Sequence, residues 1–492
     1  MLHPASVAAA TTHSTAIIDT RRGEQGKAKD GMALNIVIMA AGKGTRMRSS
    51  RPKVLHILAG RPLLQHVLDA AAGLTAARTV VVTGHGAAEV EEMATSTEKL
   101  AYVRQEPQLG TGHALQQAAT LLDDDGITLV LNGDVPLIAT DTLRALVEAV
   151  AGARLALLTV RVPDPRGYGR IVRDSANGAI RAIVEEKDAT PQQRGIDEIY
   201  TGVMAAPTRA LRRWLAALRN DNAAGEYYLT DVVGMAVADG TGVVDRQASG
   251  ETEVLGVNSA AQLADLERRY QRGAAERLLA AGVRLADPAR IDVRGELVCG
   301  SDVEIDVGCI FEGRVELADG ARIGPYCMLR NATVGAGASI RPYSHIDGEA
   351  LGATVGAGAL VGPFARLRGG ASLGADVHIG NFVEVKNASL AAGAKANHLA
   401  YIGDASLGER VNYGAGSITA NYDGAAKHRT TIGADAHIGS NCVLVAPLVV
   451  GDGATIGAGS TISRNAPAGQ LTVARTRQAT LPGWKRPVKA KR

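Results

Sequence analysis

The chain has 492 residues, enough for two or three domains. Hydrophobic residues make up 46% of it and charged residues 21%, as in ordinary soluble proteins, and a net charge of +3 is too small to indicate nucleic-acid binding. No apolar run approaches the roughly 20 residues that a membrane span needs. The four cysteines form no CxxC pair, which favours reduced thiols in a cytoplasmic protein.

Residues 1–31 lack the hydrophobic segment of a signal peptide and are rich in alanine, threonine and charge. We predict a disordered leading tail there. Met32 directly precedes the first predicted strand, so we expect the natural start at this residue.

Residues 32–257 alternate apolar runs with helical patterns. Four runs predict strands, namely NIVIMAA, RTVVVTGHG, ITLVLNGDVP and RLALLTVRV, and residues 63–73 and 114–122 predict helices. Such alternation predicts an α/β domain with a mostly parallel sheet and helices on both faces.

The first predicted strand leads into a glycine-rich basic loop, IMAAGKGTRMRSSRPK, which runs from Ile38 to Lys53. Its spacing fits neither a P-loop nor a dinucleotide fingerprint. Gly42 and Gly44 let the backbone approach a ligand, and Arg46 and Lys53 can neutralise phosphate oxygens. We favour phosphate binding over a solvated basic turn because glycines, cations and a preceding strand coincide.

Two shorter motifs are ambiguous by themselves. Asp134 in NGDVP follows a predicted strand and suits a Mg²⁺ ligand, although a turn-forming aspartate is equally common there. PQLGTGHA places Gly110, Thr111 and Gly112 at a helix start, which suits a base or phosphate but also a plain helix cap.

Residues 258–282 predict a connecting helix with Asn258 near its N-cap. From residue 283 to 492 an apolar residue recurs at every sixth position, for example at Val293, Cys299 and Ile305. This hexapeptide repeat predicts a parallel β-helix. Its cysteines (Cys299, Cys309, Cys327 and Cys442) fall on core positions, and the repeat breaks between residues 414 and 431, where we predict a projecting loop.

Several longer motifs occur in one order along the chain, and they resemble a single protein family. They are IMAAGKGTRM, PKVLH, EPQLGTGHA, NGDVPL, DPRGYGRIV and IVEEKDAT, followed by hexapeptide repeats with NHLAYIGD and ANYDG. The chain resembles, from about Ala33 to its C-terminus, the bacterial bifunctional N-acetylglucosamine-1-phosphate uridylyltransferases and glucosamine-1-phosphate N-acetyltransferases.

This resemblance implies a Rossmann-like mixed sheet in the first domain and a left-handed β-helix in the second. It implies an enzyme that acetylates glucosamine-1-phosphate with acetyl-CoA and then transfers a uridylyl group from UTP, releasing pyrophosphate. UDP-N-acetylglucosamine, the product, feeds peptidoglycan and lipopolysaccharide synthesis. The implied partners are these small molecules and two further copies of the chain, in a cytoplasmic homotrimer without nucleic acid or membrane.

The resemblance also assigns residues of the first domain. Arg46 and Lys53 would contact the phosphates, and Asp134 and Asn258 would hold Mg²⁺. Substrate contacts would come from Ala41, Gly42, Gln105, Gly110, Thr111, Asn132, Gly133, Gly169, Glu185 and Tyr200. Two of these depart from the usual family pattern, because Tyr200 stands where asparagine is usual and Asn132 where an aromatic residue is common.

In the second domain, the resemblance makes His398 the base for acetyl transfer. Glucosamine-1-phosphate would contact Arg368, Lys386, Tyr401 and Asn412, and acetyl-CoA would contact Ala415, Asn421, Tyr422, Ser440, Ala458 and Arg475. Asn397 stands where glycine is more usual. The basic tail WKRPVKAKR can reach coenzyme A phosphates, or it is simply solvated.

The hexad register alone places the residues of this second site on different sides of the β-helix. Arg368 and Lys386 each follow an inward residue and lie one coil apart, so they stack on one face and suit an anion between them. His398 falls on another side of the prism. We therefore expect a site shared between subunits of a trimer. The alternatives are a nucleotidyltransferase with a regulatory β-helix and a non-catalytic scaffold.

Overall fold

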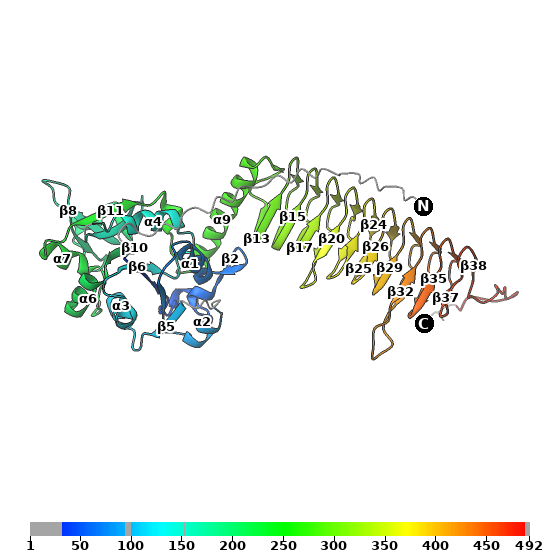
Figure 1. Ribbon diagram of the computed structural model, residues 1–492, viewed down its shortest axis with the longest axis horizontal. Helices are drawn as coiled ribbons and strands as arrows, with labels where there is room; N and C mark the ends of the chain where they lie inside the picture. Colours follow the sequence, from blue (N-terminus) through cyan, green and yellow to red (C-terminus); the bar gives the residue numbers. More distant parts are fainter. Residues whose placement is uncertain (1–31, 94–99, 152, 488–492) are drawn as a thin grey trace, which may run out of the picture.

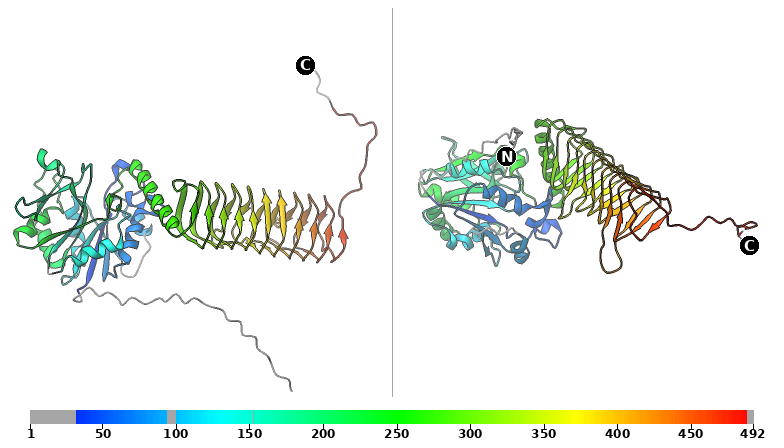
Figure 2. Two further views of the ribbon diagram at one scale, coloured as in Figure 1. Left: turned by 90° about the horizontal axis from the view of Figure 1, so that it is seen from above. Right: turned by 45° about the vertical axis from the view of Figure 1, so that its right-hand side comes forward.

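The computed structural model describes residues 32–93, 100–151 and 153–487, in which helix α9 joins an α/β half to a long prism of short strands (Figure 1). In Figure 2 the prism is a straight stack of coils that extends away from the α/β half. The tail expected at residues 1–31 lies outside the described residues. Within the described ranges, no helix is long and apolar enough to cross a lipid bilayer.

The α/β half is built on one nine-stranded mixed sheet, which confirms the predicted fold class. Strands β4, β1 and β6 are neighbours and run parallel, whereas β10 runs antiparallel between β6 and β7. In spatial order the strands are β11 (Val243–Gln247), β7 (Leu155–Arg161), β10 (Glu198–Pro207), β6 (Ile127–Asn132), β1 (Leu34–Met39), β4 (Arg78–Thr83) and β5 (Leu100–Arg104), with the hairpin of β8 (Gly169–Arg173) and β9 (Ile180–Val184) paired to β10.

Helices cover both faces of this sheet. Side chains alternate along β1, so Ile36 and Ile38 pack against α1 and α4, and Val37 packs in the core beneath α3, α6 and α7. These helices are α1 (Leu63–Ala72), α3 (Thr111–Ala118), α4 (Thr140–Glu148), α6 (Thr208–Ala217) and α7 (Asp231–Ala238), and the shorter ones are α2 (Ala87–Met93), α5 (Pro191–Arg194) and α8 (Glu251–Val254). Helix α3 begins at Thr111, as the PQLGTGHA motif predicts, and therefore before the helical pattern of residues 114–122.

The connecting helix α9 (Ala260–Ala280) is shared between the two halves. Its N-cap is Ser259, directly after Asn258, and the Ser259 hydroxyl accepts a hydrogen bond from the Gln262 backbone. Leu266 near its start packs in a small core with Leu58 and Leu63 of the α/β half. Ala274 and Ala275 near its end belong instead to the core of the prism.

The prism is a left-handed parallel β-helix whose inward hexad positions form one continuous core. One face is an 11-stranded sheet, which contains β24 (His378–Asn381), β27 (Lys395–His398) and β30 (Asn412–Tyr413). The other two faces form a 16-stranded sheet, because β17 (Met328–Val334) bends across their common corner and pairs with strands on both. This second sheet contains β22 (Arg366–Leu367), β25 (Glu384–Lys386), β28 (Tyr401–Gly403), β31 (Ile418–Ala420) and β32 (Thr430–Ile432).

The cysteines fill the prism core, as their hexad positions predict. Cys309, Cys327 and Cys442 are buried, and Cys299 is half-buried against the first coils. Burial raises the pKa of Cys309 to about 12 and those of Cys327 and Cys299 to about 11. These three thiols therefore stay protonated at neutral pH and are poor nucleophiles.

The break in the repeat is shorter than the sequence indicates. We predicted a loop between residues 414 and 431, but β31 and β32 keep both ends of this stretch in the coil. Only residues 421–429 leave it, as a hairpin closed by a bridge between Tyr422 and Lys427, and Figure 1 shows this hairpin projecting from the prism. Hydrogen bonding to neighbouring coils retains the flanking residues, because β31 and β32 pair with strands on both sides.

Candidate functional sites

The glycine-rich loop follows β1 and folds back over Lys53. Gly44 has φ +58°, and a Cβ there would lie 2.7 Å from the Cβ of Lys53, so only glycine allows this close approach. A Cβ on Gly42 would meet no atom within 4 Å, which leaves the backbone open to a ligand. Ala41 is buried beneath the loop, and Arg46 is exposed on a single 3₁₀ turn, Thr45–Met47.

Lys53 connects the two predicted metal ligands. Its ammonium forms an ion pair with Oδ2 of Asp134, which follows β6, and donates a hydrogen bond of 3.1 Å to Oδ1 of Asn258. The Val257 backbone N–H also donates to the Asp134 carbonyl, at 3.0 Å, and so holds the two segments together. A cation already lies between these two oxygen donors, so their arrangement fits a divalent metal ion when Lys53 turns towards a phosphate.

Three residues assigned to substrate contacts, Gln105, Gly110 and Thr111, are fixed by hydrogen bonds around the start of α3. The buried Gln105 amide donates to the Gly110 carbonyl at 2.8 Å, and the Thr111 hydroxyl accepts from the Leu229 backbone at 3.0 Å. Gly110 has φ +108°, and a Cβ there would lie 2.7 Å from the Tyr227 carbonyl. The loop before α3 is therefore held against residues 227–229, a contact that the sequence alone did not reveal.

Three further residues assigned to substrate contacts, Gly169, Glu185 and Tyr200, gather around β10. Tyr200 pairs with Gly169 in the sheet, and a Cβ on Gly169 would lie 3.7 Å from both carboxylate oxygens of Glu185. The Thr230 hydroxyl donates to Glu185 at 3.0 Å. Burial raises the pKa of Glu185 and also that of Tyr200, whose buried hydroxyl has no partner among the described residues. Thr230 is a member of this cluster that the motifs did not indicate.

Asn132 ends β6 beside this cluster, and Gly133 follows it. Gly202 has φ +86°, and a Cβ there would lie 2.0 Å from the Asn132 amide nitrogen. Gly202 therefore makes room for the Asn132 side chain, and a glycine inside the apolar run of residues 198–207 was the available signal. The Gly133 backbone N–H donates to the Met39 carbonyl at 2.9 Å, which fixes the start of the Asp134 turn.

His398 ends strand β27 on the 11-stranded sheet and is exposed. Its Nδ1 lies 2.9 Å from Oδ1 of Asn381, the residue at the same position one coil earlier. An amide oxygen can only accept, so in the neutral ring Nδ1 carries the proton and Nε2 has the lone pair. Asn381 thus orients the predicted base, and its place one coil before His398 is a signal that the motifs do not contain.

Four residues assigned to acetyl-CoA follow His398 in a line along one corner of the prism. The carbonyls of His398, Ala415 and Ser440 each accept a backbone hydrogen bond from the next coil, at 3.4, 2.8 and 2.8 Å. The Ala458 carbonyl accepts from the Arg475 guanidinium at 2.7 Å. The line therefore runs His398, Ala415, Ser440, Ala458, Arg475, with one member per coil, and it suits an extended ligand whose acetyl end lies at the base.

Arg368 and Lys386, the predicted ligands of the sugar phosphate, lie on the 16-stranded sheet, and we call them the phosphate clamp. Arg368 and Lys386 stack on successive coils, because Leu367 pairs with Val385. The Arg368 guanidinium also contacts Glu384 at 3.2 Å and Glu349 at 3.4 Å, so carboxylates of the neighbouring coils already neutralise part of its charge. Tyr401 occupies the next coil of this face, opposite Glu384. Asn412 lies with His398 on the 11-stranded sheet.

The projecting hairpin is anchored by a buried carboxylate. Asp404 accepts hydrogen bonds from the amides of Asn387, at 2.5 Å, and of Asn421. The hydroxyl of the exposed Tyr422 donates to the Gly424 carbonyl at 2.6 Å. Asp423 accepts from the backbone of Ala425 and Ala426 at 2.8 and 2.7 Å, so the hairpin has a defined shape. Asp404 is the second positioning residue that the sequence did not single out.

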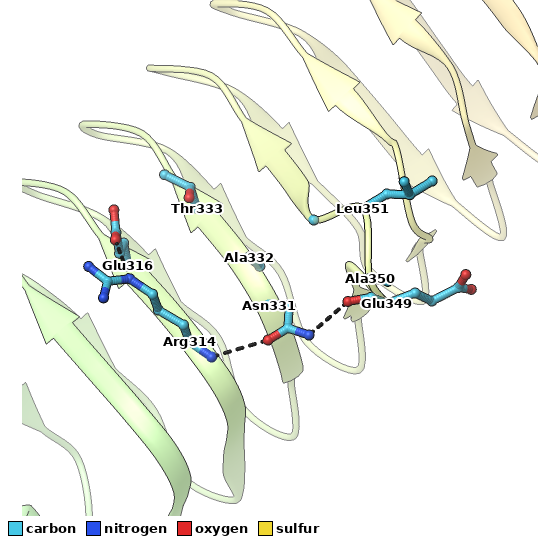
Figure 3. Close-up of a pocket in the computed structure, with 9 residues that line it drawn as sticks. Arg314, Glu316, Asn331, Ala332, Thr333, Glu349, Ala350 and Leu351 are labelled. Carbon is cyan, nitrogen blue, oxygen red and sulfur yellow. Dashed lines mark hydrogen bonds and ion pairs between the residues drawn. The ribbon is translucent and has the colours of Figure 1, made fainter. Parts of the chain in front are cut away.

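A surface hollow on the early coils adjoins the clamp, and Figure 3 shows its lining. Asn331 joins its two sides, accepting from the Arg314 backbone at 3.2 Å and donating to the Glu349 carbonyl at 2.7 Å. Arg314 is paired with Glu296 and Glu316. Because the single cation that lines it is already paired with carboxylates, we assign this hollow no anionic ligand.

Within residues 32–93, 100–151 and 153–487, no group of three or more histidine, cysteine or acidic side chains is arranged to hold a metal ion. Asp134 and Asn258 would supply only two ligands. A Mg²⁺ ion typically takes one or two protein ligands and completes its shell with water and substrate phosphates, so this sparse set fits it.

Comparison with known proteins gives matches to both halves. Residues 36–282 match the MobA-like NTP transferase domain family, and residues 352–387 and 429–464 match the bacterial transferase hexapeptide repeats. The bifunctional protein GlmU of Methylibium petroleiphilum is 69% identical over 93% of this chain and 99% of its own length. The proteins of the same name from an Acidovorax species and from Cupriavidus taiwanensis are 65% and 60% identical, with the same coverage.

Proposed function

The chain belongs to the family of bifunctional GlmU proteins, and we propose that it makes UDP-N-acetylglucosamine in two steps at two separate sites. An acetyl group passes from acetyl-CoA to glucosamine-1-phosphate, and a uridylyl group then passes from UTP to N-acetylglucosamine-1-phosphate. The geometry that carries this proposal is His398, oriented by Asn381, at the head of a line of residues on the β-helix, far along the chain from the Lys53–Asp134–Asn258 cluster.

The uridylyl step needs positioning and charge neutralisation. The attacking oxygen of the sugar phosphate is already anionic, so no general base is required. Lys53 and Arg46 neutralise the UTP phosphates, and Gln105, Gly110 and Thr111 hold the uracil. Asp134 and Asn258 would hold Mg²⁺, which supplies further neutralisation of the transferring phosphate when bound.

The acetyl step needs a base, because the amine of glucosamine is largely protonated near neutral pH and must lose a proton before it attacks the thioester. Nε2 of His398 can accept this proton, and Asn381 holds the ring in the required tautomer. Arg368 and Lys386 bind the sugar phosphate, with Tyr401 and Asn412 beside the sugar. Ala415, Ser440, Ala458 and Arg475 bind acetyl-CoA, with Asn421 and Tyr422 on the hairpin.

A regulatory or purely structural β-helix is the alternative to a second active site. Such a β-helix has no need of an exposed histidine held by an amide on the preceding coil. The decisive experiment is whether the purified protein acetylates glucosamine-1-phosphate with acetyl-CoA. An uridylyltransferase without this activity would favour the regulatory alternative.

We propose that the working form is a cytoplasmic homotrimer. Reduced core cysteines suit the cytoplasm. The clamp and the base lie on different sheets of one prism, which suits a site completed by a neighbouring subunit. The basic tail follows the last coil, and Trp484 within it is exposed, whereas residues 488–492 lie outside the described part of the chain.

The raised pKa of Glu185 predicts a pH effect on sugar binding. Ionised Glu185 accepts hydrogen bonds, so KM for N-acetylglucosamine-1-phosphate should rise on acidification at a higher pH than an ordinary glutamate would give. Glu185→Gln should show a high KM without this acid limb. Initial rates across the pH range test this.

Stability separates this role from a structural one. A raised pKa means that burial disfavours the ionised carboxylate, so its contribution to folding is best at low pH and is lost as pH rises through the folded-state pKa. Glu185→Gln should therefore melt at a higher temperature than the wild type at neutral pH, although it binds sugar less well. A lower melting temperature would contradict this account.

The division of α9 predicts where an active uridylyltransferase fragment must end. A fragment that ends at residue 258 lacks Leu266 of α9, which packs on Leu58 and Leu63 of the α/β half. Residues 32–282 should therefore retain uridylyl transfer, whereas residues 32–258 should be less stable and less active. Thermal unfolding and uridylyl assays of both fragments test this, and equal behaviour would show that α9 contributes nothing.

A further inference from the structure

A short hairpin of the α/β half lies against the helix that joins the two halves. It consists of β2 (Ile57–Leu58) and β3 (Arg61–Pro62), with Ala59 and Gly60 at its tip. Figure 1 shows it beside α9, which β2 contacts. The chain enters the hairpin from Lys53 through one 3₁₀ turn, so the hairpin and this residue of the predicted uridylyl site belong to one continuous segment.

The tip of the hairpin is held by side chains from two helices. The Ala59 backbone N–H donates a hydrogen bond of 2.7 Å to Oε2 of Glu267 in α9. Nε2 of His66 in α1 lies 2.9 Å from the Leu58 carbonyl, and because a carbonyl can only accept, Nε2 is the donor. Ala59 is 3% exposed and has φ +47°, so Glu267 satisfies a buried N–H in a left-handed turn.

Glu267 is itself fixed by the first coil of the β-helix. Its other carboxylate oxygen, Oε1, accepts from the Gln271 amide at 2.8 Å. Gln271 is buried and bonds to the backbone of Val293 in β13 (Ile291–Cys299), donating to the carbonyl at 3.0 Å and accepting from the N–H at 2.7 Å. Both oxygens of Glu267 and both ends of the Gln271 amide are therefore used, which fixes the two side chains.

A small apolar core connects the segments that the hairpin and α9 belong to. It contains Met47 of the glycine-rich loop, Leu58 of the hairpin, Val257 and Leu266 of α9. Val257 directly precedes Asn258, and its backbone N–H donates to the Asp134 carbonyl at 3.0 Å. Because cores are closely packed, a shift of the hairpin relative to α9 would also move the glycine-rich loop and the segment of Asn258.

The predicted metal site takes its residues from the two segments that Glu267 joins. Lys53 lies in the segment that leads into the hairpin, and Asn258 directly precedes the N-cap of α9. The hydrogen bond of 3.1 Å between their side chains is one link between these segments. The bond from Ala59 to Glu267, further along both segments, is the second. The separation of Lys53 and Asn258 therefore depends on both links.

We propose that Glu267 is a positioning residue of the uridylyl site. By holding the hairpin against α9, it sets the separation of Lys53 and Asn258 and so the shape of the predicted Mg²⁺ and phosphate site. This inference rests on the proposed uridylyl transfer, and it adds a residue that lies in none of the motifs. Glu267 takes no part in chemistry, and acetyl transfer on the β-helix does not depend on it.

Three substitutions at this position separate the reach of the side chain from its charge. Glu267→Ala removes both hydrogen bonds. Glu267→Asp keeps the charge, but the shorter side chain cannot contact Ala59 and Gln271 together. Glu267→Gln lacks the charge but has the length and an oxygen that accepts from Ala59. The matched control is Glu276→Ala, because Glu276 is an exposed glutamate on the same helix that pairs with Arg272.

Full-length proteins are assayed for both reactions, with Mg²⁺ varied in the uridylyl assay, and their thermal unfolding is recorded. Glu267→Ala and Glu267→Asp should lower the uridylyl rate about tenfold at limiting Mg²⁺ and raise the Mg²⁺ concentration for half the maximal rate by a similar factor. Glu267→Gln should keep most of the uridylyl rate, and the control should keep all of it. Acetyl transfer should be unchanged in every variant.

Three kinetic results would overturn the proposal. One is a ranking that follows charge, in which Glu267→Asp is active and Glu267→Gln is not. Another is a wild-type response to Mg²⁺ in Glu267→Ala. The third is an equal loss of both reactions in Glu267→Ala, since this would show that Glu267 supports the fold of the whole chain.

Hydrogen exchange without metal or substrate gives a readout that does not depend on catalysis. In Glu267→Ala the amides of residues 45–62 and 253–262 should exchange faster than in the wild type, whereas those of β24, β27 and β30 should be unchanged. Faster exchange confined to residues 57–62 would show that Glu267 holds the hairpin but not the site, and would overturn the proposal.

The same measurements on Glu267→Asp decide the question if Glu267→Ala does not fold. Wild-type protein without uridylyl transfer would contradict the proposed function. The exchange of residues 45–56 would still show whether Glu267 connects the hairpin and α9 to the glycine-rich loop, so the two failures are distinguishable.

Discussion

Replacing Asp134 with alanine is expected to abolish uridylyl transfer and to leave acetyl transfer near the wild-type rate. Asp134 supplies the carboxylate of the predicted Mg²⁺ site, and its only ion-pair partner among the described residues is Lys53. The variant therefore removes one metal ligand and releases Lys53 from its position. We expect the uridylyl rate to fall by at least about a hundredfold, as for the loss of a group that neutralises transition-state charge.

The two reactions are assayed separately, with N-acetylglucosamine-1-phosphate and UTP for one and glucosamine-1-phosphate and acetyl-CoA for the other. Asp134→Asn keeps the shape and an oxygen donor but lacks the charge, so it should regain part of the rate at higher Mg²⁺ concentration. Asp141→Ala, a change at an exposed residue of α4, is the control. Equal loss of both activities in Asp134→Ala would show that Asp134 supports the fold instead.

The sequence predicts the repeated parts of this fold well, because periodicity is a local signal. Hexad positions such as Ile305, Leu329 and Val385 are buried as the period requires, and the apolar runs of the first half form strands. The extent of the hairpin was overestimated, because the retention of residues 414–420 depends on hydrogen bonds to coils that are distant in sequence. Hexad rhythm alone contains no such information.

The sequence did not identify the residues that position other residues of the two sites. Asn381, Asp404 and Thr230 bind no ligand in the proposed mechanism, but they hold His398, Asn421 and Glu185. Their partners are about one coil away or across the α/β core, so neither a motif nor a period marks them. Arg368 shows the same limit, since its contacts with Glu349 and Glu384 depend on the stacking of three coils.

Co-assembly of two inactive variants is expected to restore acetyl transfer if the site is shared. Arg368→Ala lacks part of the clamp and His398→Ala lacks the base, so each should be inactive alone. In a ring where each base meets the clamp of the next chain, any mixed trimer contains one junction at which an intact His398 faces an intact Arg368. A mixed trimer should therefore work at about one third of the wild-type rate, and random equal mixing should give about one quarter overall.

A second pair of variants makes this result specific. Arg368 and Lys386 lie on the same face of one chain, so a co-assembly of Arg368→Ala with Lys386→Ala leaves every clamp incomplete and should regain nothing. Trimers assembled separately and then blended should also stay inactive, and the uridylyl rate of each sample measures the amount of folded protein. Recovery in the first pair and none in the second would locate the base and the clamp on different chains. If neither pair recovers activity although both form mixed trimers, each chain must contain a complete site. The substrate would then have to contact His398 and Arg368 of the same prism, although these two residues lie on different sheets.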